Sequence, residues 1–141
     1  VMLSDFADRP PRTVADDEIL AIGRRRLRFL STPHLPHGWD AGLWFDQTDR
    51  TLFCSDLFFQ PGDPAAMEDS DILAPAEAAI RTGQAGPLAN DVPYTRHTDA
   101  HLARLAELEP ATLAVMHGSS FRGDCRGAID GLRSVLRQVL G

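Results

Sequence analysis

Residues 111–140 read ATLAVMHGSSFRGDCRGAIDGLRSVLRQVL, a short apolar run followed by a longer amphipathic segment. Residues 112–116 have the length and composition of a buried strand. From Asp124 onward, apolar residues recur at helical spacing, while three arginines lie on the opposite face. This part of the chain therefore predicts a strand, a loop and a helix that packs its apolar face against the rest of the protein.

Strand patterns dominate the first half of the chain. Residues 18–22 are strand-like, residues 26–30 alternate in polarity, and the break at Gly23-Arg24 between them predicts a hairpin. Residues 41–45 and Thr51–Ser55 predict a second hairpin, joined by a polar turn.

Two helices are predicted between the hairpins and the final strand. The first lies within residues 70–81, with Ser70 or Asp71 as its cap, and the second spans residues 99–108 after Thr98 as N-cap. The order strands, helix, helix, strand, helix predicts an α/β or α+β arrangement of layers.

Length and charge restrict the classes of function. The 141 residues have room for one ordinary domain. All 14 basic residues are arginines, and against 20 acidic residues they leave a formal net charge of −6. We therefore expect no nucleic-acid partner, because phosphate binding needs a basic field. The chain begins at Val1 rather than Met, which leaves open that it is part of something longer.

Cysteine usage and hydropathy restrict the compartment. Cys54 and Cys125 lack metal-site spacing, and we expect both to be buried residues in a reducing environment. No apolar run approaches the roughly 20 residues of a membrane helix, and the N-terminal stretch lacks the basic and apolar regions typical of a signal peptide. These features favour a cytoplasmic protein without a membrane partner.

Three chemistry-bearing side chains share one setting, because each lies in a loop next to a predicted strand. His37 precedes residues 41–45, Asp56 follows Thr51–Ser55, and His117 follows residues 112–116. Loops at strand ends are where sheets place functional side chains. Imidazole nitrogen and carboxylate oxygen suit borderline divalent metals such as zinc or iron. Each residue alone fits a structural role better than a functional one, so the prediction of a metal site rests on the combination.

The strings TPHLPHGWDAGLWFD (32–46), LFCSDLFF (52–59) and LAVMHGSSFRGD (113–124) resemble the C-terminal half of the metallo-β-lactamase superfamily. The resemblance is strongest to its flavodiiron and oxygen-binding diiron relatives. It implies a two-metal site in which Asp56 bridges the ions, His37 binds one and His117 the other. It also implies an α/β fold, namely half of an αββα sandwich with a mixed or antiparallel sheet and helices on one face.

Other residues near these strings carry weaker expectations. His34 competes with His37 as a ligand, but the Trp39-Asp40 pair that follows His37 matches the diiron relatives. Asp40 and His34 are then expected to contact and orient the ligand side chains rather than bind metal themselves. Ser119 and Ser120 are candidate substrate-binding residues, although a tight turn explains them equally well.

The superfamily's first metal motif, HxHxDH or HxExDH, is absent from the chain. Of the remaining histidines, His97 and His101 have helical spacing but are expected to lie on the surface. By the resemblance, a first half absent from this chain would supply the other ligands, so we expect weak metal binding or none by this chain alone. The exposed sheet face would need a cover: the missing half, a second copy of the chain, or a separately encoded half.

Three functions remain open at this stage. The first is the C-terminal part of a dinuclear-metal hydrolase acting on a small molecule, inactive by itself. The second is a diiron protein that binds, reduces or senses O₂ or NO. The third is a truncated interaction module in which the motif is a relic.

Overall fold

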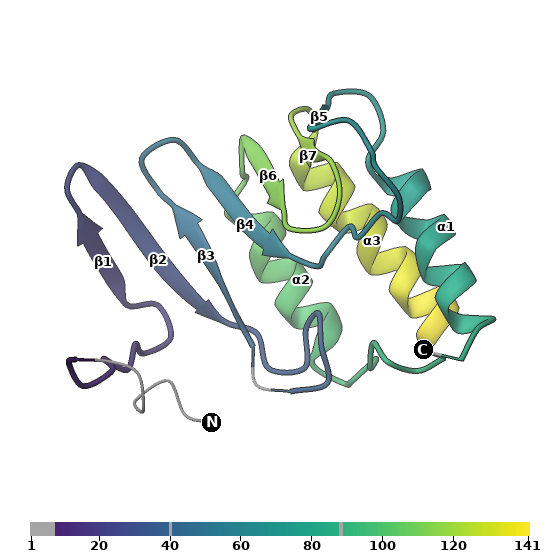
Figure 1. Cartoon of the computed structure of the whole chain (residues 1–141), viewed down its shortest axis with the longest axis horizontal. Coiled ribbons are helices and arrows are strands. Elements are labelled where there is room, and N and C mark those ends of the chain that lie inside the picture. The colour runs from purple at the N-terminus through teal and green to yellow at the C-terminus, as the bar shows by residue number, and fades with distance from the viewer. Residues whose placement is uncertain (1–7, 40, 88) are drawn as a thin grey trace.

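The computed structural model describes residues 8–39, 41–87 and 89–141, which form one mixed sheet and three helices (Figure 1). The strands are β1 (Ile19–Ile22), β2 (Arg25–Ser31), β3 (Gly42–Asp46), β4 (Thr51–Ser55), β5 (Met67–Glu68), β6 (Thr112–Val115) and β7 (Ser120–Phe121). The helices are α1 (Leu73–Gln84), α2 (Thr98–Glu107) and α3 (Cys125–Leu140).

The sheet has the order β1-β2-β3-β4-β6-β7-β5. The first four strands form an antiparallel meander, and β6 joins it parallel to β4. Strand β7 is antiparallel to β6, and β5 is parallel to β7. Strands β2, β4 and β6 therefore run in the same direction, and their carboxyl ends lie at one edge of the sheet.

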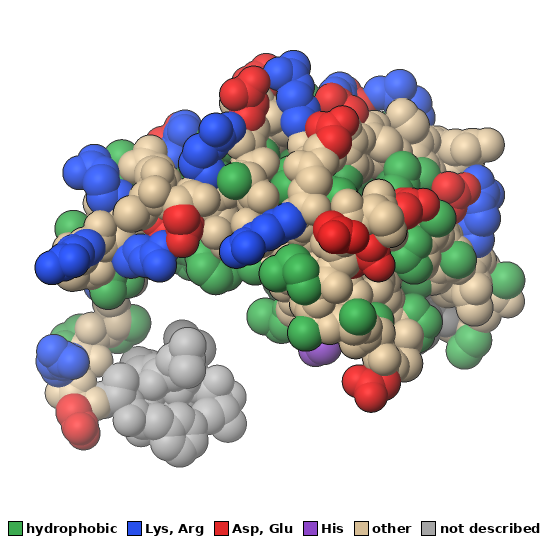
Figure 2. Space-filling model, turned by 90° about the horizontal axis from the view of Figure 1, so that it is seen from above, with side chains coloured by type: hydrophobic (Ala, Val, Ile, Leu, Met, Phe, Trp, Pro, Cys, Tyr) green, Lys and Arg blue, Asp and Glu red, His purple; other side chains and the backbone are tan. Residues whose placement is uncertain are grey.

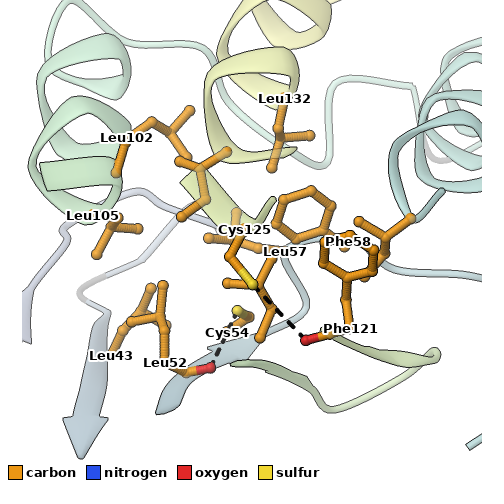
Figure 3. Packing of buried hydrophobic residues seen from close by; sticks show 14 of the residues in the cluster. Leu43, Leu52, Cys54, Leu57, Phe58, Leu102, Leu105, Phe121, Cys125 and Leu132 are labelled. Atoms are coloured by element: carbon orange, nitrogen blue, oxygen red, sulfur yellow. Dashed lines mark hydrogen bonds between the residues drawn. The ribbon is translucent and has the colours of Figure 1, made fainter. Parts of the chain in front are cut away.

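One face of the sheet packs against the helices. Leu30 on β2 pairs with Leu43 on β3, and Leu52 on β4 pairs with Leu113 on β6. All four leucines are almost completely buried, together with residues of α2 and α3. Figure 3 shows Leu43 and Leu52 of the sheet facing the leucines of these helices. The helical face predicted from the apolar spacing of α3 is therefore part of the core.

The opposite face of the sheet carries the alternate residues of the same strands. Phe29, Trp44, Phe53 and Ala114 form a cross-strand row, and we call this row the open face. Phe53 is 45% exposed, and the ring centroids of Phe29 and Trp44 lie 5.1 Å apart. No described helix covers this row, so the helices lie on one face, as the resemblance implied.

Local signals explain most element boundaries. Gly23 has a positive φ of 58° between β1 and β2, which suits a residue without a β-carbon. Asp124 caps α3 by accepting a hydrogen bond from the Gly127 N–H at 2.8 Å. The expectation that Ser70 or Asp71 is the N-cap of α1 is wrong, because Ile72 occupies that position without a side-chain hydrogen bond. The Asp71 carboxylate, one residue earlier, still accepts from the N–H groups of Leu73 and Ala74.

The expectation that Thr98 is the N-cap of the second helix is wrong. The helix begins at Thr98 itself, and His97 occupies the cap position without a side-chain hydrogen bond. The Thr98 hydroxyl instead accepts from the Thr95 N–H at 2.9 Å, because the preceding turn folds back over it. Strands β5 and β7 are not predicted from the sequence, since each has only two residues.

Both cysteines are buried, as expected. Figure 3 shows Cys54 and Cys125 between the sheet and α3, and their thiols contact the backbone carbonyls of Leu52 and Phe121. Burial raises the pKa of both thiols, which keeps them protonated. Neither cysteine is therefore available as a thiolate ligand, although Cys54 lies only two residues before Asp56.

The surface shows no broad field of one sign on the face in Figure 2, where acidic and basic side chains are interspersed. Many arginines pair with carboxylates, such as Arg104 with Asp16 and Arg133 with Asp99. Among the described residues, no helix has the length and hydropathy needed to cross a membrane.

Candidate metal centre

The structure brings His37, Asp56 and His117 together at the edge where β2, β4 and β6 end, and we call them the donor triad. Asp56 Oδ2 lies 2.8 Å from His37 Nε2, and Asp56 Oδ1 lies 2.5 Å from His117 Nδ1. The two oxygens of one carboxylate thus face two different imidazoles. The triad comes together because three strands of the same direction each end in one of its loops.

Backbone hydrogen bonds hold the loops of Asp56 and His117 against each other. The Met116 N–H donates to the Ser55 carbonyl, and the Gln60 N–H donates to the His117 carbonyl, both at 2.9 Å. A β-carbon on Gly118 would lie 3.2 Å from the Phe58 carbonyl oxygen, so the close approach of these loops favours glycine there. The spacing between Asp56 and His117 is therefore set by the backbone.

The loop of His37 is held by a different set of contacts. Its Leu35 side chain is buried, and Leu35 donates its N–H to the Thr32 carbonyl at 2.9 Å. The buried Thr32 hydroxyl donates in return to the Leu35 carbonyl at 2.9 Å. The Trp39 ring stacks on the His37 ring, with centroids 4.3 Å apart and an angle of 13° between the planes. These contacts orient the imidazole toward Asp56.

Exposure differs among the three donors. The side chains of His37 and Asp56 are 23% and 20% exposed, whereas the His117 side chain is 60% exposed. His117 therefore lies at the open rim of the site, and the other two lie deeper.

The other residues singled out in the sequence lie elsewhere. His34 is exposed and does not join the triad, and Asp40 falls outside the described residues. Ser119 is buried with its N–H 3.5 Å from Gln60 Oε1, and Ser120 pairs with Met67 in the sheet. A role of either serine in substrate binding stays a prediction.

His101 is only partly at the surface, unlike the exposed His97. Its Nε2 is buried and has no hydrogen-bond partner among the described residues. Desolvation by burial is the main cause that lowers the pKa of His101, and the charges of His97 and Arg104 add to it against the opposing effect of Asp16.

We predict that stability falls as the pH drops below the ordinary histidine value of 6.5. The folded chain disfavours the His101 imidazolium, so the unfolded chain binds more protons in that range. The urea midpoint should decrease between pH about 7.5 and about 5.5, and His101→Leu should flatten this decrease. His34→Leu is the control and should keep the slope. An unchanged slope in the His101 variant contradicts the assignment.

A pocket of about 300 Å³ adjoins the donor triad. Its remaining walls come from the loops around Leu35 and Leu57, from α1, from residues 91–92 and from α3. Sequence reasoning does not find these residues, because they come from five separate segments with no common spacing.

No protein-family model matches the chain, and no curated protein matches it by sequence. Several solved structures do match it. Rubredoxin oxygen:oxidoreductase from the anaerobe Desulfovibrio gigas matches with a TM-score of 0.65 and 24% identity over 93% of this chain and 33% of that chain. The flavodiiron protein from Giardia intestinalis matches with a TM-score of 0.60 and 22% identity over 89% of this chain and 30% of that chain.

A metallo-β-lactamase family protein from Thermus thermophilus matches with a TM-score of 0.56 and 20% identity. The match covers 92% of this chain and 36% of that chain. The chain thus spans about a third of the length of these proteins, and at such identities the likeness concerns the fold. The resemblance inferred from the three strings is confirmed at that level. The chain has a metallo-β-lactamase-type α/β fold over the extent of a half-domain, and it shares this fold with flavodiiron proteins.

Proposed function

We propose that this chain supplies one half of a dinuclear metal centre, with Asp56 as the bridging ligand, His37 on one ion and His117 on the other. One observation carries the proposal: each oxygen of Asp56 faces a different imidazole, at 2.8 and 2.5 Å. Here the two contacts are hydrogen bonds, and a bridging carboxylate would use the same two oxygens, one for each ion. The shared fold with flavodiiron and metallo-β-lactamase family proteins supports it.

The donor triad has the ligand atoms that zinc and iron bind, but it has too few of them for two ions. Two imidazoles and one carboxylate suit zinc or iron, which take nitrogen and oxygen ligands. Among the described residues, no group of three or more histidine, cysteine or acidic side chains has the geometry to hold an ion. With two donors per ion, the chain alone should bind divalent metals weakly.

A second polypeptide segment would complete both the centre and the sheet. The open face exposes Phe53, and Met116, which follows β6, is 67% exposed. Large apolar side chains in a row are unfavourable in water. We propose that the missing first half of the fold covers this face and brings the remaining ligands. A second copy of the chain or a separately encoded half are the alternative covers.

The first candidate reaction for the complete centre is hydrolysis of a small-molecule substrate in the cytoplasm. Two bound cations would lower the pKa of a water molecule and position it for attack. The residues of this chain would hold the ligands in place: Trp39 packs on the His37 ring, and the loop bonds between residues 116–117 and 55–60 hold Asp56 beside His117. The exposed His117 leaves the site open to substrate from one side.

A diiron role in binding, reducing or sensing O₂ or NO is the second candidate. The observation that favours it is the match to proteins described as an oxygen oxidoreductase and a flavodiiron protein. Metal analysis and an optical spectrum of the anaerobically purified, complete protein separate iron from zinc and so separate the two roles. If the complete protein contains no metal, the third function, an interaction module without catalysis, is favoured instead.

The ligand assignment is testable on the chain itself by adding Co²⁺, whose unpaired electrons broaden nearby NMR signals. We expect the lowest Co²⁺ additions to broaden the signals of His37, Asp56 and His117. The signals of His97 and His101 serve as an internal control and should stay sharp. Broadening that starts at the control pair, or no local broadening at the triad, contradicts the proposed centre.

A further inference from the structure

The residues that line the pocket beside the donor triad indicate what kind of molecule the pocket accepts. His37, Asp56 and His117 form part of its lining. The apolar lining residues come mainly from two loops and from the facing sides of α1 and α3; they are Leu35, Pro36, Leu57, Phe58, Phe59, Ala79, Ile80, Val92, Leu132 and Leu136. A molecule that reaches the triad through this pocket therefore contacts mostly carbon.

Few polar groups interrupt these walls. Apart from the triad, the polar side chains in the lining are Gln84 and Asp91. Gln84 Oε1 already accepts a hydrogen bond from the Asn90 N–H at 3.2 Å, so this oxygen is bonded to the loop that follows α1. The pocket thus offers little to replace the water shell of a strongly polar molecule.

The charges around the pocket disfavour an anion. All 14 basic residues of the chain are arginines, and none of them lines the pocket. The charged groups that do line it, apart from the histidines, are the carboxylates of Asp56 and Asp91. In the metal-free chain, a sulfonate, phosphate or carboxylate group entering the pocket would meet these carboxylates and no arginine.

The size of the pocket bounds the molecule. Its volume is about 300 Å³, roughly twice that of a 150 Å³ apolar cavity known to bind benzene. A body of about two fused rings therefore fits.

We propose that this pocket binds an uncharged, mainly apolar small molecule of up to about two rings and presents one end of it to the donor triad. That this molecule is the one acted on at the metal centre rests on the proposed function. Binding of the apolar body does not depend on metal, because the walls that hold it are formed by the chain itself.

Gly83 on α1 offers room for an added side chain at the pocket, and it also lines a neighbouring pocket together with Pro61 and Pro87. It lines the pocket, and a β-carbon placed there meets no heavy atom within 4 Å. Gly83→Leu therefore adds a side chain where there is open space, and leucine favours the helix more than glycine does. Ala74→Leu adds the same side chain to an exposed position of α1 outside the pocket lining, and it is the matched control.

The experiment uses the metal-free chain and two probes of the same ring system, neutral 2-naphthol and anionic naphthalene-2-sulfonate. Binding is followed by probe fluorescence, and circular dichroism verifies that each variant is folded. We expect 2-naphthol to bind at least about tenfold more tightly than the sulfonate. Gly83→Leu should weaken 2-naphthol binding by at least about tenfold, and Ala74→Leu should leave it unchanged.

Equal affinity for the two probes overturns the proposal, because the charge of the walls then has no effect. Unchanged 2-naphthol binding in the Gly83 variant overturns it as well, as does an equal loss in both variants. Failure of the proposed metal centre is seen separately, in the Co²⁺ titration. A chain that binds 2-naphthol in the expected pattern but shows no Co²⁺ broadening at the triad retains the pocket and loses the centre.

Discussion

Replacing Asp56 with alanine is expected to weaken Co²⁺ binding by the chain by about 100-fold or more. Asp56 is the one anion among the three donors, and each of its oxygens faces a different imidazole. Its loss removes a ligand from both ions at once, so the effect should exceed that of losing either histidine. The affinity is measured by following the broadening at His37 and His117 as Co²⁺ is added.

Two further variants separate ligation from folding. Asp56→Asn keeps the shape and a hydrogen-bonding oxygen but removes the charge, and it should lose most of the affinity as well. Asp63→Ala removes an exposed carboxylate from the loop that follows and should have no effect. Equal Co²⁺ affinity in the Asp56 and Asp63 variants would show that Asp56 is not a ligand.

Replacing Leu113 with alanine is expected to lower the free energy of unfolding by about 3 kcal/mol. The Leu113 side chain is fully buried on β6 and pairs with the fully buried Leu52 of β4. The variant would leave a cavity between the sheet and the helices, where the surrounding side chains have little room to relax. Urea denaturation at neutral pH measures the change.

Met116 provides the matched control, since it follows the same strand and its side chain is 67% exposed. Met116→Ala should change the free energy of unfolding by no more than about 0.5 kcal/mol. A similar loss in both variants would mean that the helix-facing side of β6 is not the core. Because β6 also leads into His117, the Leu113 variant should weaken Co²⁺ binding more than the Met116 variant does.

The elements that could be predicted are those whose signal is local. Helix α3 shows its apolar face at regular spacing along one stretch of the chain, and the structure contains this helix with that face buried. Strands β5 and β7 could not be predicted, because two residues carry no periodicity and the strands exist only by pairing with each other and with β6. Thr98 shows the limit of a local rule, since its hydroxyl bonds to the turn before it instead of capping the helix.

The residue types of the site could be read from the chain, whereas a common meeting point was implied only by the family resemblance and by no local pattern. The chain order placed His37, Asp56 and His117 next to strands, and its composition excluded a basic surface. The parallel pairing of β4 with β6 and the shared direction of β2 brought the three loops to one edge. Contacts between loops then turned His37 rather than His34 toward Asp56, and the packing of α1 and α3 formed the apolar pocket beside them. Such features depend on pairing and packing between residues far apart in the chain. The free energy of these long-range contacts cannot be read from a local sequence pattern.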